Sequence, residues 1–158
     1  MCAAVSDFRA CVPPSYRFNF GVDLTPYRTF MAELTEQSGA FLRPLFGSLD
    51  LVVDTKADAT PVTIADRGAE ELLRSLIAKK YPAHGIIGEE FGAHAIDAEY
   101  VWVLDPIDGT KSFISGMPVW GTLIGLTRNG NPCYGMMHQP FTREFFFGDG
   151  SSAHWRGP

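Results

Sequence analysis

The sequence of 158 residues has few cysteines, no long apolar run and no cluster of basic residues. Cys2, Cys11 and Cys133 are too few and too scattered for a disulfide framework or a zinc site, which favours a reducing compartment. No apolar stretch reaches the roughly 18 to 20 residues that span a bilayer, so a membrane is not an expected partner. A formal charge of −5 without any Lys/Arg-rich run also argues against nucleic acid as a partner.

The beginning of the chain lacks a clear targeting signal. Residues 1–22 mix Cys, Ala, Arg and Pro with aromatic residues and contain no uninterrupted apolar segment, so they make a poor secretory signal. Arg9 and Arg17 would suit a weak organellar leader, whereas Asp7 argues against one. We therefore expect residues 1–22 to form a loose N-terminal arm and the protein to be cytoplasmic.

The rest of the chain, residues 23–158, has the composition of one globular domain, since 46% of the whole sequence is hydrophobic. Apolar residues at three- and four-residue intervals predict a helix from about Leu24 to Gly47, with Thr25 as its N-cap and Gly39 at a close contact. The other predicted elements are a helix from Pro61 or Val62 to Lys80, strands at Leu49–Thr55, Val119–Thr127, Cys133–His138, Glu144–Phe147 and Ala153–Arg156, an exposed loop at Lys56–Thr60 and a hairpin turn at Asn129–Gly130. This pattern predicts an α+β fold in which two helices pack on a mainly antiparallel sheet.

The stretch Val101–Gly116, VWVLDPIDGTKSFISG, carries the clearest chemical signal. It starts as a buried strand, and Asp105 and Asp108 then appear where the strand is expected to open into a loop. Pro106 stiffens that loop and can turn the carbonyl of Ile107 inward. Because Mg²⁺ prefers oxygen ligands and commonly uses one or two carboxylates, this stretch predicts a metal site.

The residues after these carboxylates suit a phosphate group. Gly109 and Thr110 can open a short helix whose N–H groups face an anion. The simpler interpretation is that Asp-Pro and Asp-Gly pairs only mark turns. A second apolar run that ends in carboxylates, Ile86–Phe91 with Glu89 and Glu90, favours the metal site over that interpretation.

Other candidate groups have plainer interpretations. Asp66 lies in the first turn of the second predicted helix, where a carboxylate complements the helix dipole. Ser112, Ser115 and the cysteines have no evident activating partner, so we interpret them as structural. The four histidines lack the spacing of a zinc cluster and are interpreted as loop or packing residues. The large aromatic residues are expected in the core: Trp102, Trp120 and Phe145–Phe147.

Three motifs together resemble a known family. IADRGAEELL at residues 64–73, GIIGEEFG at residues 85–92 and VWVLDPIDGTKSFISGMPVWGTLIGL at residues 101–126 match, in order and spacing, the inositol-monophosphatase-like superfamily of magnesium-dependent, lithium-sensitive phosphatases. The resemblance extends from roughly Leu24 to Arg156 and implies the N-terminal half of an αβαβα sugar-phosphatase-like fold.

The resemblance also implies roles for single residues. Glu89 and Asp105, with the carbonyl of Ile107, would hold a first Mg²⁺, and Asp105 and Asp108 would bridge towards a second. Glu89, Thr110 and Asp66 would be the catalytic residues, with Thr110, supported by Asp66, orienting the attacking water near Glu89. The phosphate would contact Asp108 and the N–H groups of Gly109 and Thr110.

Within the superfamily, the four residues that follow the DPIDGT motif, Lys111–Ile114, most resemble those of the histidinol-phosphate phosphatase branch. This implies hydrolysis of histidinol phosphate in histidine biosynthesis. Two alternatives stay open at this point, a phosphatase for inositol phosphate or 3′-phosphoadenosine phosphate, and a truncated, non-catalytic metal-binding or assembly module.

The chain departs from the family in one respect. Members carry a second αβ half with a WDxxA-type motif, whose aspartate helps to hold the second metal ion and the substrate, and no such motif occurs here. We therefore expect the C-terminal half to be absent, the second ion to bind weakly and an apolar surface to be exposed. The expected partners are a small phosphorylated metabolite and either further copies of the chain or the missing half.

Overall fold

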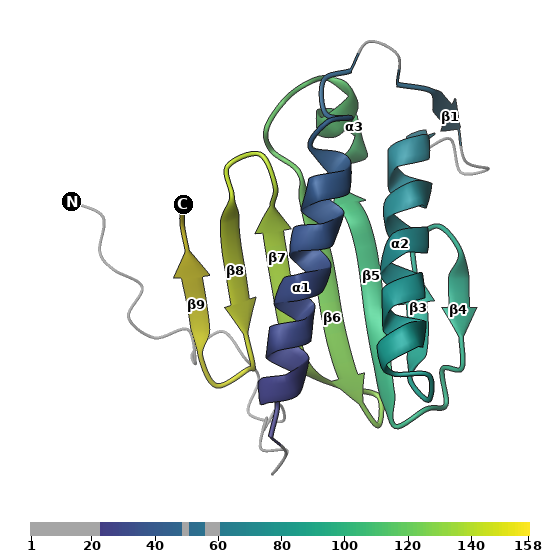
Figure 1. Cartoon of the computed structure of the whole chain (residues 1–158), viewed down its shortest axis with the longest axis vertical. Helices are drawn as coiled ribbons and strands as arrows, with labels where there is room; N and C mark the ends of the chain where they lie inside the picture. Colours follow the sequence, from purple (N-terminus) through teal and green to yellow (C-terminus); the bar gives the residue numbers. More distant parts are fainter. Residues whose placement is uncertain (1–22, 49–50, 56–60) are drawn as a thin grey trace.

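A computed structural model describes residues 23–48, 51–55 and 61–158 of the chain. Helices and strands alternate first, and strands dominate the second half (Figure 1). In chain order the elements are α1 (Thr25–Leu42), β1 (Val53–Thr55), β2 (Pro61–Thr63), α2 (Ile64–Lys80), β3 (Gly85–Gly88), β4 (Gly92–His94), β5 (Tyr100–Asp108), α3 (Thr110–Ile114), β6 (Gly121–Arg128), β7 (Asn131–Gln139), β8 (Glu144–Gly148) and β9 (Ala153–Arg156). The predicted N-terminal arm, 1–22, and the predicted loop Lys56–Thr60 lie outside the described residues.

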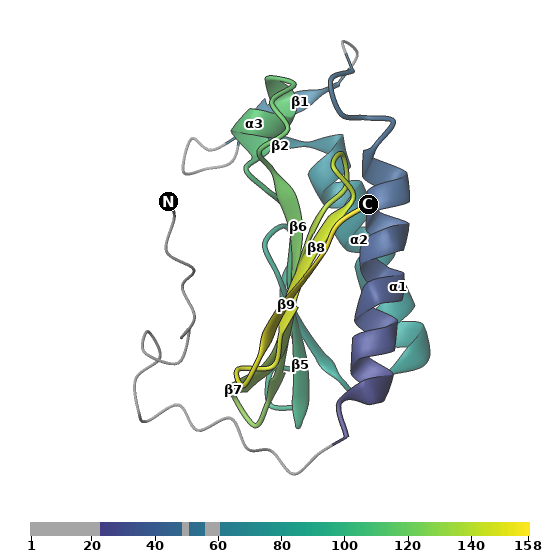
Figure 2. The same cartoon turned by 90° about the vertical axis from the view of Figure 1, so that its left-hand side faces the viewer.

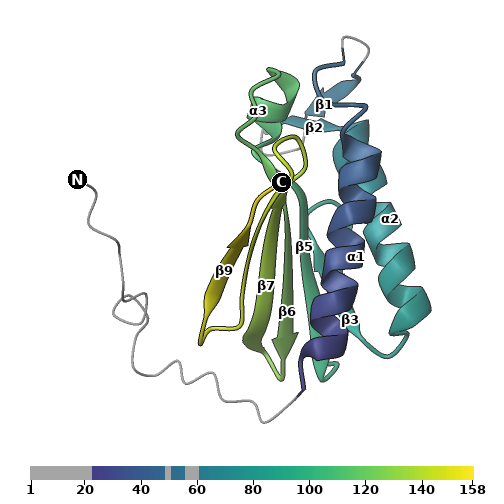
Figure 3. The same ribbon diagram turned by 60° about the vertical axis from the view of Figure 1, so that its left-hand side comes forward.

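Seven strands form one sheet in the order β4-β3-β5-β6-β7-β8-β9, and β1 and β2 form a separate antiparallel pair. Among the described strands of the large sheet, only β3 and β5 are parallel neighbours, and the other neighbours are antiparallel. Figures 2 and 3 show α1 and α2 on the same face of this sheet. The predicted α+β class, with two helices on a mainly antiparallel sheet, is confirmed. None of the helices in the described part has the length and apolarity that crossing a bilayer requires.

Both predictions for the ends of α1 need correction. Leu24, and not Thr25, is the N-cap, and the Thr25 N–H donates to Asp23 Oδ1 at 2.9 Å. The helix ends at Leu42 instead of continuing to Gly47. Pro44 contributes to the early end because it has no N–H to continue the helical hydrogen bonds, although Arg43 before it still has helical backbone angles.

The second predicted helix begins later than expected. Pro61–Thr63 forms β2, which pairs with β1, and α2 starts at Ile64 because Thr63 caps it. The Thr63 hydroxyl accepts from the Ala65 N–H at 3.0 Å, and the Asp66 carboxylate accepts from the Thr63 N–H at 2.7 Å. This reciprocal capping box fixes the start of the helix. The strand predicted at Leu49–Thr55 is shorter, Val53–Thr55, and its first two residues lie outside the described part.

The four C-terminal strands lie where the alternating pattern predicts them, and the hairpin at Asn129–Gly130 is confirmed. Both turn residues have positive φ angles, 48° and 76°, as a two-residue turn between twisted strands requires. Gly39 is also confirmed at a close contact, since an added Cβ would lie 2.6 Å from His138 Cε1. The carbonyl of Thr35 in α1 contacts His138 Nδ1 at 2.9 Å.

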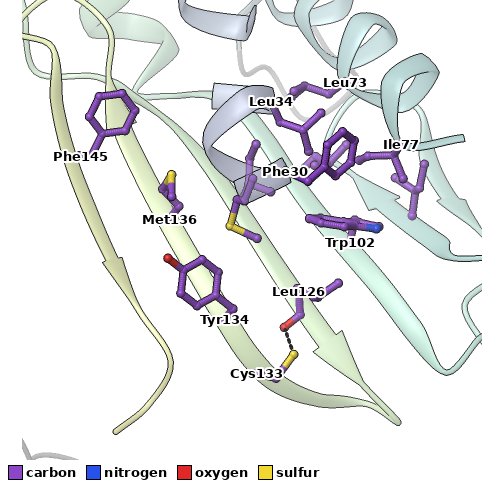
Figure 4. Packing of buried hydrophobic residues seen from close by; sticks show 14 residues of the cluster. Phe30, Leu34, Leu73, Ile77, Trp102, Leu126, Cys133, Tyr134, Met136 and Phe145 are labelled. Atoms are coloured by element: carbon purple, nitrogen blue, oxygen red, sulfur yellow. Dashed lines mark hydrogen bonds between the residues drawn. The ribbon is translucent and has the colours of Figure 1, made fainter. Parts of the chain in front are cut away.

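The main hydrophobic core lies between the two long helices and the sheet. Trp102 of β5 is fully buried at its centre, and Cys133 Sγ donates to the Leu126 carbonyl at its lower edge (Figure 4). The predicted core positions Trp102, Trp120 and Phe145 are confirmed, whereas Phe146 is 43% exposed because it points to the opposite face. A second cluster surrounds α3 and the start of α2; its buried members are Leu42, Ala65, Ala69, Ile107, Phe113 and Trp120.

The opposite face of the sheet is covered by neither α1 nor α2 (Figure 2). One row of paired positions crosses five strands there: Asp105, Leu123, Met137, Phe146 and Trp155. Met137, Phe146 and Trp155 are 36%, 43% and 61% exposed. This row, which we call the open-face row, starts at one of the predicted metal ligands.

Candidate active site

Strand β5 carries the two predicted aspartates, but it does so differently from the prediction. The strand does not open into a loop before Asp105; it continues to Asp108. Its pairing with β6 is irregular between these two residues, where Pro106 cannot donate a ladder hydrogen bond. The Pro106 carbonyl instead accepts from the Thr122 hydroxyl at 2.8 Å. Across the irregularity Asp105 pairs with Leu123 and Asp108 with Gly121, two residues apart on β6, so the extra residue in β5 brings both aspartates to one face of the sheet. Asp105 is partly buried there and Asp108 is exposed.

Glu89 reaches Asp105 through the one parallel pairing in the sheet. Gly88, the last residue of β3, pairs with Leu104 of β5. The Glu89 N–H then donates to the Leu104 carbonyl at 3.2 Å, which places the next side chains on the two strands beside each other. The carboxyl groups of Glu89 and Asp105 are hydrogen-bonded. The structure therefore brings together two acidic residues from separate sequence motifs.

The environment of Asp105 is unfavourable for a negative charge. Burial raises the pKa of its carboxyl group to about 8, and the hydrogen bond with Glu89 and the charges of Glu89 and Asp108 act in the same direction. Asp105 Oδ1 is buried and has no hydrogen-bond partner among the described residues. A buried oxygen of this kind is costly unless a donor or a cation satisfies it.

The Glu89 and Asp105 carboxylates supply part of the ligand set that a hard divalent cation requires. Two adjacent carboxylates are the usual protein contribution to a Mg²⁺ site. In the described part of the chain, however, no three His, Cys, Asp or Glu side chains come close enough together to enclose a metal ion. Asp108 influences the pKa of Asp105 through its charge but does not complete such a group. Ile107 anchors this segment, since its side chain is 1% exposed in the core around α3.

The Asp66 carboxylate caps helix α2 and also contacts Thr110. It is 2% exposed, and its Oδ2 accepts from the N–H and the hydroxyl of Thr63, at 2.7 Å and 2.6 Å, within the capping box. Its Oδ1 lies 3.2 Å from the Thr110 hydroxyl, which also lies 3.2 Å from the Ile107 carbonyl. Helix capping therefore leaves one oxygen of Asp66 directed at Thr110, across 44 residues of sequence.

Gly109 makes the turn from β5 into α3. Its φ of 94° is in the left-handed region, where a side chain is strained, and an added Cβ would also make a tight contact of 3.0 Å with the Val119 carbonyl oxygen. The predicted short helix after Gly109 is confirmed, and it starts at Thr110. The phosphate contacts of the Gly109 and Thr110 N–H groups stay a prediction.

Sequence reasoning missed Glu70. This carboxylate is fully buried on α2 and accepts hydrogen bonds from the turn that contains Glu89. A signal was available, because Asp66 and Glu70 lie four residues apart, on the same side of the helix as Leu73 and Ile77. An acidic residue on the apolar face of an amphipathic helix is unusual unless it is paired.

The histidines lie away from the carboxylates. His84 accepts a hydrogen bond from Trp102 Nε1 at 3.1 Å and stacks on Tyr81, and His138 is buried against Phe145. The other two, His94 and His154, lie in strands β4 and β9.

The family comparison agrees with this geometry. A family model described as the inositol monophosphatase family matches residues 23–157, and the chain belongs to that family. It is 50% identical over 117 residues, covering 73% of this chain and 34% of the relative, to the bifunctional phosphatase IMPL2, chloroplastic, of Arabidopsis thaliana. It is 44% identical over 107 residues, covering 68% and 41%, to the histidinol-phosphatase of Mycobacterium tuberculosis.

The fold is also that of solved members of the family. The structure of an inositol monophosphatase from Zymomonas mobilis superposes with a TM-score of 0.71 at 37% identity, covering 86% of this chain and 52% of that one. The matches thus span about a third to a half of the length of these relatives.

Proposed function

We propose that this chain carries the metal- and phosphate-binding part of a Mg²⁺-dependent phosphate-monoester hydrolase that acts on histidinol phosphate. The observation that carries the proposal is the partly buried Asp105 carboxylate, whose Oδ1 has no hydrogen-bond partner among the described residues and which lies against Glu89. A partly buried carboxylate beside an exposed one favours a cation that both can bind, and Mg²⁺ takes oxygen ligands of this kind.

In the proposed site, Glu89, Asp105 and the Ile107 carbonyl hold the first Mg²⁺, and Asp105 and Asp108 contact a second. Bound Mg²⁺ supplies a water of lowered pKa and stabilises the charge on the phosphoryl group. The exposed position of Asp108 suits a ligand that is shared with substrate and solvent. The second position has fewer ligands from this chain, so it binds more weakly.

Thr110 and Asp66 have positioning roles for water in this proposal. Asp66 Oδ1 holds the Thr110 hydroxyl, and Thr63 holds the other oxygen of Asp66. Thr110 is thereby oriented to accept from the attacking water beside Glu89. The N–H groups of Gly109 and Thr110 bind the phosphate oxygens at the start of α3.

Sequence similarity supports the choice of substrate. The histidinol-phosphatase reported above is more similar to this chain than the inositol monophosphatase of known structure. The residues that follow Thr110, Lys111–Ile114, also resemble the histidinol-phosphate branch. We therefore place histidinol phosphate ahead of inositol phosphate and 3′-phosphoadenosine phosphate.

A phosphate-release assay tests the proposal. The chain is incubated with Mg²⁺ and, separately, with histidinol phosphate, inositol 1-phosphate and 3′-phosphoadenosine 5′-phosphate. We expect fastest release from histidinol phosphate, inhibition by Li⁺ and a loss of roughly 100-fold or more in Asp105→Asn. Asp97→Asn, an exposed aspartate between β4 and β5, is the matched control and should keep the wild-type rate. No release from any substrate would overturn the proposal.

A second candidate is a non-catalytic metal-binding or assembly module. It is favoured by the absence, within the described residues, of a third acidic side chain at the Glu89 and Asp105 pair. Calorimetry combined with the phosphate-release assay separates the two candidates. Mg²⁺ binding that Asp105→Asn abolishes, without phosphate release from any of the three substrates, would support the module.

A further inference from the structure

Glu70 is a buried carboxylate that binds the turn after β3. Its side chain is fully buried and accepts from the Glu90 N–H at 2.7 Å through Oε2. Its other oxygen, Oε1, accepts from the Phe91 N–H at 3.2 Å and from Arg74 Nε at 2.7 Å. Both oxygens are thus occupied, and the charge is paired with Arg74, as a buried carboxylate requires.

These contacts fix the backbone on both sides of Glu89. The Glu89 N–H is held by the Leu104 carbonyl of β5, while the next two N–H groups along the chain go to Glu70. Arg74 also donates to the Gly92 carbonyl, at the far end of the same turn. The backbone that carries the Glu89 side chain therefore has little freedom to move away from Asp105.

Gly88 shows how closely Glu70 approaches this turn. An added Cβ at Gly88 would lie 1.9 Å from Glu70 Oε1 and 2.3 Å from its carboxyl carbon. A side chain at this position would displace the carboxylate from its backbone partners. Glycine in the GIIGEEFG motif therefore makes room for Glu70, although its φ is not in the left-handed region.

The same helix holds both parts of the site. Asp66 and Glu70 are one turn apart on α2; Asp66 binds Thr110 after β5, and Glu70 binds the turn after β3. A rigid helix with two such contacts sets the position of the two loops relative to each other.

We infer that Glu70 is a positioning residue for the metal ligand Glu89, acting through the N–H groups of Glu90 and Phe91. This inference rests on the proposed function of Glu89. Groups that orient metal ligands from outside the coordination sphere typically change metal affinity by 10- to 100-fold when they are removed.

Glu70→Gln tests the inference. This variant keeps the size of the side chain but replaces one acceptor oxygen with an NH₂ group. That group cannot accept a hydrogen bond from the N–H groups of the turn. Glu71→Gln is the matched control, because Glu71 is the next residue on α2 and is exposed. Two quantities are measured on the whole chain: the Kd for Mg²⁺ by calorimetry, and hydrogen exchange of the Glu90 and Phe91 amides without metal. Metal affinity is a readout that a purely structural role would leave unchanged in a folded variant.

We expect Glu70→Gln to raise the Kd by roughly 10-fold or more and to accelerate exchange of both amides, with far-ultraviolet circular dichroism unchanged. Glu71→Gln should stay within about twofold of wild type in both measurements. If Glu70→Gln does not fold, Arg74→Gln decides the question, because it removes the cation that holds Glu70 Oε1 and so weakens, without removing, the hydrogen bonds from the Glu90 and Phe91 N–H groups. It should raise the Kd by a smaller factor, about threefold, and accelerate the same amides.

The outcomes separate this inference from the proposed function. Wild-type affinity and exchange in the folded Glu70→Gln variant, or in Arg74→Gln in its place, overturn the inference even if the chain hydrolyses histidinol phosphate. A chain that binds Mg²⁺ more weakly after Glu70→Gln, yet releases no phosphate, supports the inference and overturns the proposed hydrolase.

Discussion

The carboxyl group of Asp105 is hydrogen-bonded to that of Glu89, although 16 residues and a complete strand, β4, separate them in sequence. The contact exists because β3 and β5 are parallel neighbours, and Gly88, the last residue of β3, pairs with Leu104, the residue before Asp105. Two carboxyl groups at this distance cannot both ionise without cost in a partly buried site. The chain thus stores an unfavourable interaction at the position where we propose that a cation binds.

Removing the Asp105 charge should stabilise the metal-free chain at high pH. The folded state raises the pKa of Asp105 from 3.8 to about 8, so between these values the folded chain binds more protons than the unfolded chain. Stability then falls as the pH rises through this window. Asp105→Asn does not titrate, so above pH 8 we expect it to be more stable than wild type by roughly 1–3 kcal/mol in urea unfolding without Mg²⁺.

Wild type and Asp105→Asn should also differ in how Mg²⁺ changes their thermal stability. Saturating Mg²⁺ should raise the Tm of wild type and leave that of Asp105→Asn unchanged, because only a ligand that binds the folded state shifts the equilibrium. Asp97→Asn should behave as wild type in both experiments. Equal Tm shifts in all three proteins would contradict a Mg²⁺ site at Asp105.

Gly39→Ala should destabilise the fold even though alanine favours helix. The added Cβ would lie 2.6 Å from Cε1 of His138, which is itself buried against Phe145. We expect a net loss of about 1–3 kcal/mol in the free energy of unfolding. Gly135→Ala is the control, since an added Cβ there meets no atom within 4 Å. A Gly39→Ala variant as stable as wild type would mean that His138 moves aside without cost.

Local sequence signals were sufficient to predict the features that depend on residues close together in the sequence. The turn at Asn129–Gly130 and the alternation on both sides of it set the hairpin of β6 and β7. They were also sufficient for Asp105 and Glu89 as candidates, because each ends an apolar run. The end of α1 also has a local cause, because Pro44 has no N–H to continue the helical hydrogen bonds.

Other features depend on contacts that no local pattern contains. The parallel pairing of β3 with β5 joins segments on either side of β4, and only this pairing places Glu89 beside Asp105. Pro61–Thr63 is a strand because β1 pairs with it, although its sequence suits the first turn of a helix. Glu70 was missed because its partners are backbone N–H groups about 20 residues away, which are chemically identical at every position.

Acid should weaken the fold through His138. Burial lowers the pKa of this imidazole to about 4; the Thr35 carbonyl and Glu36 oppose the shift, while Arg43 and Arg156 reinforce it. In the unfolded chain the pKa is near 6.5, so between about pH 6.5 and 4 the unfolded state binds more protons.

Stability should therefore fall as the pH is lowered through this range, by at most about 3 kcal/mol from this residue. Urea unfolding of wild type and His138→Gln from pH 7 to pH 4 measures the effect. The stability difference between the two proteins should shrink towards low pH, because only wild type has to deprotonate this side chain on folding. His94→Gln, at an exposed site in β4, is the control. Its free energy of unfolding should change with pH as that of wild type does. A constant difference between wild type and His138→Gln would contradict a buried, neutral imidazole.

The open-face row should make the isolated chain associate. Met137, Phe146 and Trp155 lie side by side on paired strands and are all at least one-third exposed. Contiguous apolar patches on a sheet face are typical of surfaces that bind another protein or another copy. Sedimentation velocity at increasing concentration should show wild type forming dimers or larger species, and Phe146→Glu should shift the distribution towards monomer. Phe141→Glu, exposed in the turn between β7 and β8, is the control and should leave association unchanged. A wild-type chain that sediments as a compact monomer at every concentration would show that this face needs no partner.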